Sequence, residues 1–377
     1  ASTAMRLRTT AYLETPLALS VRRATGNDLD TIRHIPGTVL RGALAQAWCD
    51  LGRNVDGTFR ELFVSGKVRY RDLRINGCRT GPLSGRVCTR AEGDHGVADH
   101  LLQAAAGTSI AAECPECGAK RRRVSEFVRR DRANGVVLEE VRTRRIAHTA
   151  IDARLLRVAP GQFHSSQVIS EGQIFFGEVE AETAAAASSL QDLAGDGMTL
   201  YLGRGRTRGQ GRVSFSMVSG TPGADAALEE RLREFNDAAH ARFPSLGKYL
   251  LFSCTLQSPA LLFDDWLMSR CEIEPEDLSA SLVLVDFRPM ASFRDVSVFS
   301  GWNQKAGLPK SDTWVLKPGS AFLFGKEVAP EIRDKEIRTL AGALSEALEG
   351  GIGERRDEGL GEITICDEFH SLFAEAS

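Results

Sequence analysis

Two groups of residues have the types and the spacing to do chemistry, and the first is a set of cysteines. Four of the eight cysteines fall in one segment, as a pair separated by nine residues and then as Cys-Pro-Glu-Cys-Gly. Four such thiolates predict a tetrahedral structural zinc site, which would supply on the order of 10 kcal/mol of folding free energy to a segment with few apolar residues. The predicted ligands are Cys78, Cys88, Cys114 and Cys117. His95 and His100 lie between the two pairs and are candidate substitute ligands; four unrelated free cysteines are the alternative.

The second group is a loop rich in glycine and arginine, Gly203-Arg204-Gly205-Arg206-Thr207-Arg208-Gly209-Gln210-Gly211. Glycine has no Cβ, so the backbone can take positive φ values and approach another backbone closely. Arginine adds fixed charge and planar donors that suit phosphate. The loop therefore predicts a site for a polyanion, with a flexible turn and solvated charges as the alternative. Its candidate phosphate-binding residues are Gly203, Arg204, Gly205, Arg206, Arg208, Gly209 and Gly211.

Other basic residues are clustered, although the net charge is only −3. The clusters are Lys120 to Arg123, Arg129 to Arg132, Arg142 to Arg145 and Arg204 to Arg212. Local basic faces on a nearly neutral chain suit a subunit that binds nucleic acid at one defined place. Asn134-Gly135 is a strong hairpin signal, so we expect a basic arm that projects from the zinc segment, unless the charges are only a solvated surface. Candidate RNA contacts from these clusters are Arg121, Arg122, Arg123 and Arg144.

The elements that must position these groups follow from hydrophobic periodicity. Met5 to Leu13 alternates and predicts a half-exposed strand, and an apolar stripe after Thr38 predicts a helix that this residue caps. Gly42 inside the helix costs about 1 kcal/mol relative to alanine, so we expect a strand or a ligand to approach closely beside Arg41. Both Arg41 and Gly42 are candidate RNA contacts. Alternating residues flank the 203–211 loop, and a loop between two strands is neither a dinucleotide fingerprint nor a P-loop.

The plan of the chain is repeated, as its length of 377 residues allows. The first half, 5–219, and the second half, 247–377, each open with a strand and close with a helix, spaced glycines and a last strand. The second loop, Gly350 to Gly361, also has acidic residues, so we expect it to be structural or to face a protein neighbour.

Several segments resemble one superfamily. Ile35-Pro36-Gly37-Thr38-Val39-Leu40-Arg41-Gly42-Ala43-Leu44 resembles the helix-opening signature of RAMP proteins in type III CRISPR systems. Gly301-Trp302, Gly307-Leu308-Pro309-Lys310 and Lys317-Pro318-Gly319-Ser320 resemble the type III subunit that caps the 5′ end of the guide. With the two glycine-rich closing loops, the chain resembles the type III-D RAMP subunit of the guide 5′-handle-capping group.

The resemblance implies an α+β fold of two tandem ferredoxin-like (RRM-like) βαββαβ domains. These would span 5–219, with a zinc-binding and basic insertion at about 64–150, and 247–377, joined by a linker and helix at 220–246. It also implies a non-catalytic subunit that binds the 5′ handle of the CRISPR RNA and bridges the large signalling subunit to the backbone RAMP subunits. Arg41, Arg204, Arg206 and Arg208 would contact phosphates. Aromatic residues are only 7% of the chain, which favours backbone clamping over base stacking.

Whether the chain is an enzyme stays open, because RAMP relatives include endoribonucleases. Backbone members cut target RNA with an aspartate before the first helix, where Asp28 and Asp30 occur here. Guide-processing members use a histidine base, but His34, His148 and His164 have no lysine or tyrosine at a suitable spacing.

A third alternative is a zinc-stabilised protein-interaction subunit without RNA contact. No small-molecule substrate is indicated. No apolar run approaches the roughly 20 residues that span a bilayer, and we expect a cytoplasmic protein without a membrane partner.

Overall fold

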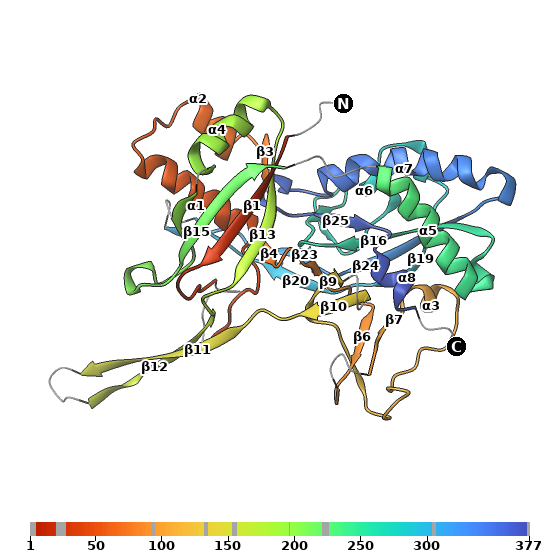
Figure 1. The fold of residues 1–377 in the computed structure, drawn as a ribbon, viewed down its shortest axis with the longest axis horizontal. Helices are drawn as coiled ribbons and strands as arrows, with labels where there is room; N and C mark the ends of the chain where they lie inside the picture. Colours follow the sequence, from red (N-terminus) through yellow and green to blue (C-terminus); the bar gives the residue numbers. More distant parts are fainter. Residues whose placement is uncertain are drawn as a thin grey trace.

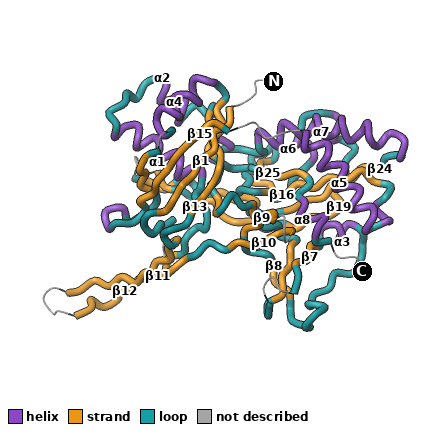
Figure 2. Tube along the Cα trace, viewed as in Figure 1, coloured by secondary structure: helices purple, strands orange, loops and turns teal. Residues whose placement is uncertain are grey.

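The computed structural model describes residues 5–19, 28–91, 95–131, 135–152, 157–195, 197–220, 226–303 and 307–374. The chain has an α+β fold with mainly antiparallel sheets, arranged as two halves side by side (Figure 1). Each half has one larger sheet with helices gathered along it, which the colouring of Figure 2 makes clear.

The first half is built on a six-stranded antiparallel sheet. Its order is β14 (Met198–Tyr201), β15 (Arg212–Ser219), β1 (Met5–Leu13), β13 (Ile174–Ala181) and β3 (Val68–Tyr70), with β4 (Arg74–Ile75) also paired to β13. Its helices are α1 (Gly37–Asp50), α2 (Gly57–Phe63) and α4 (Ala184–Ala194). β1 has the bounds that its alternation predicts, and Leu7, Ala11 and Leu13 are buried in the core between sheet and helices.

The start of α1 differs from the expected one. The helix begins at Gly37 after Pro36, which contributes no side-chain cap, so Thr38 is not the N-cap. The Gly37 N–H donates instead to Asp72 Oδ1 at 2.9 Å. A Cβ on Gly37 would lie 1.7 Å from the Tyr70 carbonyl oxygen, so only glycine allows the helix to begin this close to β3.

The second half is built on a four-stranded antiparallel sheet. Its order is β19 (Arg288–Phe293), β24 (Ala321–Glu327), β16 (Tyr249–Leu256) and β25 (Ile363–Ile365). α7 (Arg333–Gly350) joins β24 to β25, while the short α6 (Pro275–Leu278) occupies the segment where the first half has α1. α5 (Ala226–Arg242), expected in the connector, packs with Leu232 and Phe235 in the core of this half.

The insertion lies against the second half, although it belongs to the first half in sequence. It contains two three-stranded sheets and the helix α3 (Leu101–Ala105). The first sheet has the order β10 (Gly135–Glu139), β9 (Phe127–Asp131), β5 (Arg79–Thr80). The second has the order β7 (Val97–Asp99), β6 (Gly85–Cys88), β8 (Arg121–Arg123). Leu101 and Leu102 of α3 are buried in the core of the second half. The antiparallel pairing of β9 with β10 agrees with the hairpin expected at Asn134-Gly135, of which residues 132–134 lie outside the described ranges.

A long two-stranded arm projects from the first half, formed by β11 (Thr143–Asp152) and β12 (Arg157–Ile169) (Figure 1). At its base β12 pairs in parallel with β2 (Asp28–Leu29). The arm that leaves the body is therefore this hairpin and not one from the zinc segment. The remaining elements are β17 (Leu262–Phe263), β18 (Ser269–Arg270), β20 (Val296–Phe299), β21 (Trp302–Asn303), β22 (Leu308–Pro309), β23 (Thr313–Leu316) and α8 (Glu368–Leu372).

Candidate RNA interface and metal centre

The 203–211 loop forms a compact turn between β14 and β15. Residues 206–208 make one 3-10 turn, and Gly203, Gly205, Gly209 and Gly211 all have positive φ. A Cβ on Gly203 would lie 2.3 Å from the Ala18 carbonyl oxygen, and one on Gly211 would lie 2.0 Å from that of Leu202. Two of the glycines therefore admit the chain's own backbone rather than that of a ligand. Gly209 has open space beyond its Cα.

The basic side chains of this loop are exposed beside a hollow of about 310 Å³. Arg204 N–H donates to Ala18 O at 3.0 Å, which fixes the loop on the segment after β1. Arg206 Nε donates to Gly203 O at 3.2 Å and so keeps its side chain close to the turn. The hollow is lined by Ala18, Leu19, Leu29, Asp30, Ser166, Gln167, Arg204, Gly205, Thr207, Arg208 and Gln210. Its mix of guanidinium, amide and hydroxyl donors suits a phosphate backbone.

Sequence reasoning missed the part of this hollow that β12 contributes. Ser166 and Gln167 come from β12, and they reach the loop because β12 pairs with β2 at Ser166 and Leu29. No short motif marks these residues. The position of Ser166 and Gln167 is fixed by the register between β12 and β2, which are more than a hundred residues apart in sequence. The local sequence pattern around the two residues therefore contains no signal for this position.

Arg41 does not face this hollow. Its guanidinium donates to Asp357 at 2.5 Å and to Glu358 at 2.9 Å, both in the second glycine loop. Lys310 also contacts Glu358, at 3.1 Å. Arg41 and Lys310 thus belong to an ion-pair group that joins the two halves, and the phosphate contact expected of Arg41 stays a prediction. Apart from the helix's own backbone, no atom of the described residues lies within 4 Å of where a Cβ on Gly42 would be, so no described strand makes the expected close approach.

The remaining predicted basic contacts lie apart from the loop. Arg122 on β8 is paired with Glu126, and Arg123 lies 3.9 Å from Asp295 of the second half. Arg121 lies on the same strand of the insertion, partly buried. Arg144 on the arm forms a 3.0 Å ion pair with Glu171. The structure therefore groups the 203–211 arginines with the base of the arm and leaves the 121–123 cluster at another surface.

The candidate catalytic aspartates have different surroundings. The backbone of Asp28 pairs with Ser165, and its side chain lies outside the described part. Asp30 lines the hollow, and its carboxylate lies 3.5 Å from Arg145. His34 is half-buried, with Nε2 3.3 Å from Asp72 Oδ2, and desolvation lowers its pKa against the opposing effect of Asp72. The side chains of His148 and His164 lie outside the described part of the chain.

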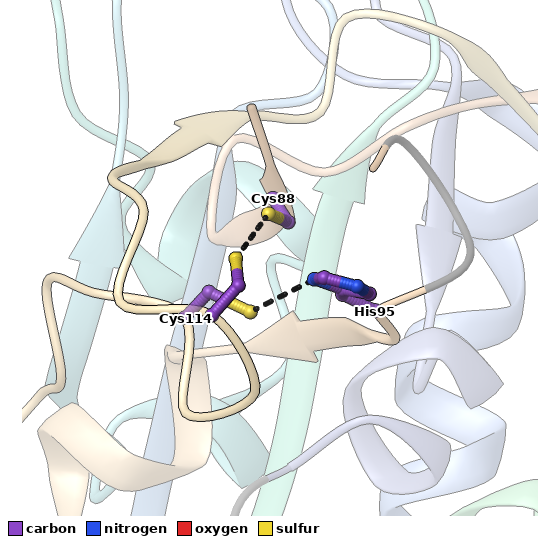
Figure 3. Close-up of side chains that lie close together, drawn as sticks. Cys88, His95 and Cys114 are labelled. Atoms are coloured by element: carbon purple, nitrogen blue, oxygen red, sulfur yellow. Dashed lines mark hydrogen bonds between the residues drawn. The ribbon is translucent and has the colours of Figure 1, made fainter. Parts of the chain in front are cut away.

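The insertion contains a cluster of side chains that could ligate a metal ion (Figure 3). It consists of Cys88, His95, Cys114 and Cys117, whose ligand atoms all lie within 4.8 Å of one another. The Cys88 and Cys117 sulfurs are 3.5 Å apart, and Cys114 Sγ is 3.7 Å from His95 Nδ1. With a Zn–S bond of about 2.3 Å, two ligands of a tetrahedron are separated by ~3.8 Å, so these donors fit a zinc ion. The Arg90 N–H donates to Cys88 Sγ at 3.4 Å and lowers the pKa of this thiol to about 6, which favours the ligating thiolate.

His95 stands where Cys78 was expected. Cys78 is buried in the core of the first half, with its sulfur 3.8 Å from Glu139 Oε2. Burial, and then the Glu139 carboxylate, raise the pKa of the Cys78 thiol to about 12, so it keeps its proton. Cys88 lies on β6, beside the cluster, whereas Cys78 precedes β5, which belongs to another sheet. The two cysteines are therefore held apart although they are close in sequence. His100 is buried at the start of α3 and is not part of the cluster.

No family model matches the chain, and no curated protein matches it. Among solved structures, one chain of Type III-B Cmr-beta bound to cognate target RNA and AMPPnP is 12% identical, with 89% of this chain and 93% of that chain covered and a TM-score of 0.44. Another Cmr-beta structure bound to cognate target RNA is 12% identical over 58% of this chain and 98% of that chain, with a TM-score of 0.37. Pyrococcus furiosus Cmr4 (Cas7) is 13% identical over 57% of this chain and all of that chain, with a TM-score of 0.28.

Since the three TM-scores lie below 0.5, the likeness supports no particular role. Within the described ranges, no helix is long and apolar enough to cross a membrane.

Proposed function

We propose that this chain is a non-catalytic RNA-binding subunit of a type III CRISPR effector complex in the cytoplasm. In this proposal it holds the 5′ handle of the CRISPR RNA and joins the large signalling subunit to the backbone RAMP subunits. Its two halves are ferredoxin-like domains. In support, β1 lies between β13 and β15 while β16 lies between β24 and β25, so the two sheets share one strand order.

The main observation is the hollow beside the 203–211 loop. Arg204, Arg206 and Arg208 are exposed on a turn that main-chain hydrogen bonds hold in place, next to donors from the base of the arm. Arg41, by contrast, is occupied within the chain by Asp357 and Glu358. The proposed RNA contacts therefore centre on the first loop. Arg144, which lies on β11 near the base of the arm, is a further proposed contact.

The metal belongs to the same proposal as a structural zinc ion. Cys88, His95, Cys114 and Cys117 would hold it, and it would fasten the β6 and β8 ends of the insertion to the 114–117 turn. No open coordination position is assigned to it, because four protein ligands complete a structural site.

Filter binding tests the RNA assignment. We expect tight binding of an RNA that bears the repeat-derived handle, with affinity that falls steeply as salt rises, because several phosphates are neutralised. Absence of binding at low salt would remove this function and favour the zinc-stabilised interaction subunit without RNA contact.

A ribonuclease is the second candidate, because Asp30 lines the same hollow as Arg204 and Arg208. Incubation of the chain with target RNA and a divalent metal ion distinguishes the two. Cleavage that is abolished by Asp30→Asn or Asp28→Asn would replace the non-catalytic assignment, and intact RNA that stays bound supports it.

A further inference from the structure

The second half has an exposed apolar tip formed by Trp266, Leu267 and Met268. It is the loop of the hairpin that β17 and β18 form, with Phe263 paired to Ser269. The three side chains are 86%, 79% and 66% exposed, respectively. Single exposed apolar residues are common, but three in succession at a hairpin tip are the kind of surface that binds a partner.

The tip is rigid. Asp264 Oδ1 accepts hydrogen bonds from the N–H groups of Trp266 and Met268, at 2.9 and 2.8 Å. The Leu267 N–H donates to Asp264 O, and the Asp264 N–H donates to Met268 O. The backbone of the tip is therefore held in one arrangement, which lowers the entropy lost on binding.

Leu267 is an unexpected residue for this position. Its φ is +60°, in the left-handed region that glycine adopts readily and a residue with a Cβ adopts at a cost. Its side chain gains almost nothing from burial in this chain, since it is 79% exposed. A leucine that strains its own backbone while 79% exposed is explained if another molecule buries it.

The charges around the tip decide what kind of molecule this is. Residues 264–277 contain six acidic residues (Asp264, Asp265, Glu272, Glu274, Glu276 and Asp277) and one basic residue, Arg270. Arg270 is already paired with Glu274 at 2.5 Å and with Asp277, and Glu272 is paired with Arg294. With both arginines counted, the tip and the segment after it keep a net negative charge, which repels RNA and anionic lipid and complements an apolar protein pocket edged by lysine or arginine.

We propose that residues 264–268 insert into such a pocket on the large signalling subunit of the effector complex. The choice of subunit rests on the proposed function: the RNA hollow is on the first half, from which the guide would continue to the backbone subunits, while the tip is on the second half. Trp266 and Leu267 are the anchors, and the acidic residues meet the basic edge of the pocket.

The test measures binding of the full-length chain to the purified large subunit encoded with it, and separately to a purified backbone subunit. Leu267→Gly removes the side chain while fitting the positive φ, so we expect an unchanged or higher melting temperature and binding to the large subunit weakened by about 30-fold or more. Trp266→Ala should act in the same direction. The control is Val55→Ser, at an exposed apolar residue of the first half (66%), which should not change binding.

Each outcome decides one question. Unchanged binding of Leu267→Gly to the large subunit overturns the inference, as does loss of binding to the backbone subunit alone or loss of self-association in sedimentation. Handle-RNA binding is measured on the same variants and should not change. A wild-type chain that binds the handle RNA but not the large subunit overturns this inference and leaves RNA binding standing. A wild-type chain that binds the large subunit through the tip but does not bind RNA overturns RNA binding and leaves this inference standing.

Discussion

The Arg74 guanidinium lies 2.6 Å from the Glu362 carboxylate, and this pair joins β4 of the first half to the residue before β25 of the second. Arg71 contacts the other Glu362 oxygen at 3.3 Å. Burial would raise the pKa of Glu362, but the attraction of Arg74 and then of Arg71 outweighs it and lowers the pKa to about 2. The two halves are therefore held together by largely buried charge as well as by apolar contact.

Glu362→Gln should destabilise the chain strongly. It removes the nearest counter-charge of Arg74, whose other carboxylate neighbour, Asp72, lies 4.0 Å away, while Arg71 keeps Glu180 at 2.7 Å. Breaking a mostly buried ion pair by removing one partner typically costs about 3 kcal/mol. Urea unfolding followed by circular dichroism measures the loss. Glu327→Gln is the control, because Glu327 pairs with Lys248 where both side chains are mostly exposed, and it should leave the midpoint unchanged. Equal effects of the two variants would contradict the role assigned to Glu362.

The same pair predicts a window of acid destabilisation. The folded-state pKa of Glu362, about 2, is below its ordinary value of 4.5, so its contribution is fully present above pH 4.5 and is lost as the pH falls toward 2. We expect the difference in unfolding free energy between wild type and Glu362→Gln to shrink across this window. A difference that is constant from pH 5 to pH 3 would show that the carboxylate charge is not what stabilises the contact.

Metal removal should unfold part of the insertion. We expect one zinc ion per chain by elemental analysis, and Cys114→Ser should reduce both the zinc content and the melting temperature, because the metal supplies folding free energy. Cys78→Ser is the matched control: this thiol is buried beside Glu139 and should leave the zinc content unchanged. Well under one zinc per wild-type chain would exclude the site, and zinc loss in Cys78→Ser alone would restore the four-cysteine set.

The sequence pattern was informative where local chemistry decides the structure. The alternation of β1, the glycines of the 203–211 loop and the three cysteines of the cluster all follow from short-range pattern. It was less informative where distant segments meet. Cys78 and Cys88 are close in sequence but enter different sheets, and Arg41 finds Asp357 across more than three hundred residues. Residue spacing encodes neither the separation of Cys78 from Cys88 nor the pairing of Arg41 with Asp357, because both depend on how the insertion and the second half pack.

The arginines of the first loop should account for part of the salt dependence of RNA binding. Each phosphate contact to single-stranded RNA contributes about −0.7 to the slope of log K against log salt. Replacing Arg204, Arg206 and Arg208 together by alanine should therefore flatten the slope by about 2 and weaken binding to handle RNA at low salt.

Two controls separate this effect from a general loss of charge. Arg338→Ala, on α7 of the second half, removes an arginine that is 67% exposed and should leave the slope unchanged. Arg41→Ala should lower stability through its lost contacts with Asp357 and Glu358, yet leave the slope unchanged as well. If Arg41→Ala flattened the slope while the triple variant did not, RNA would bind at the start of α1, and the second loop would have to release Arg41 for it to do so.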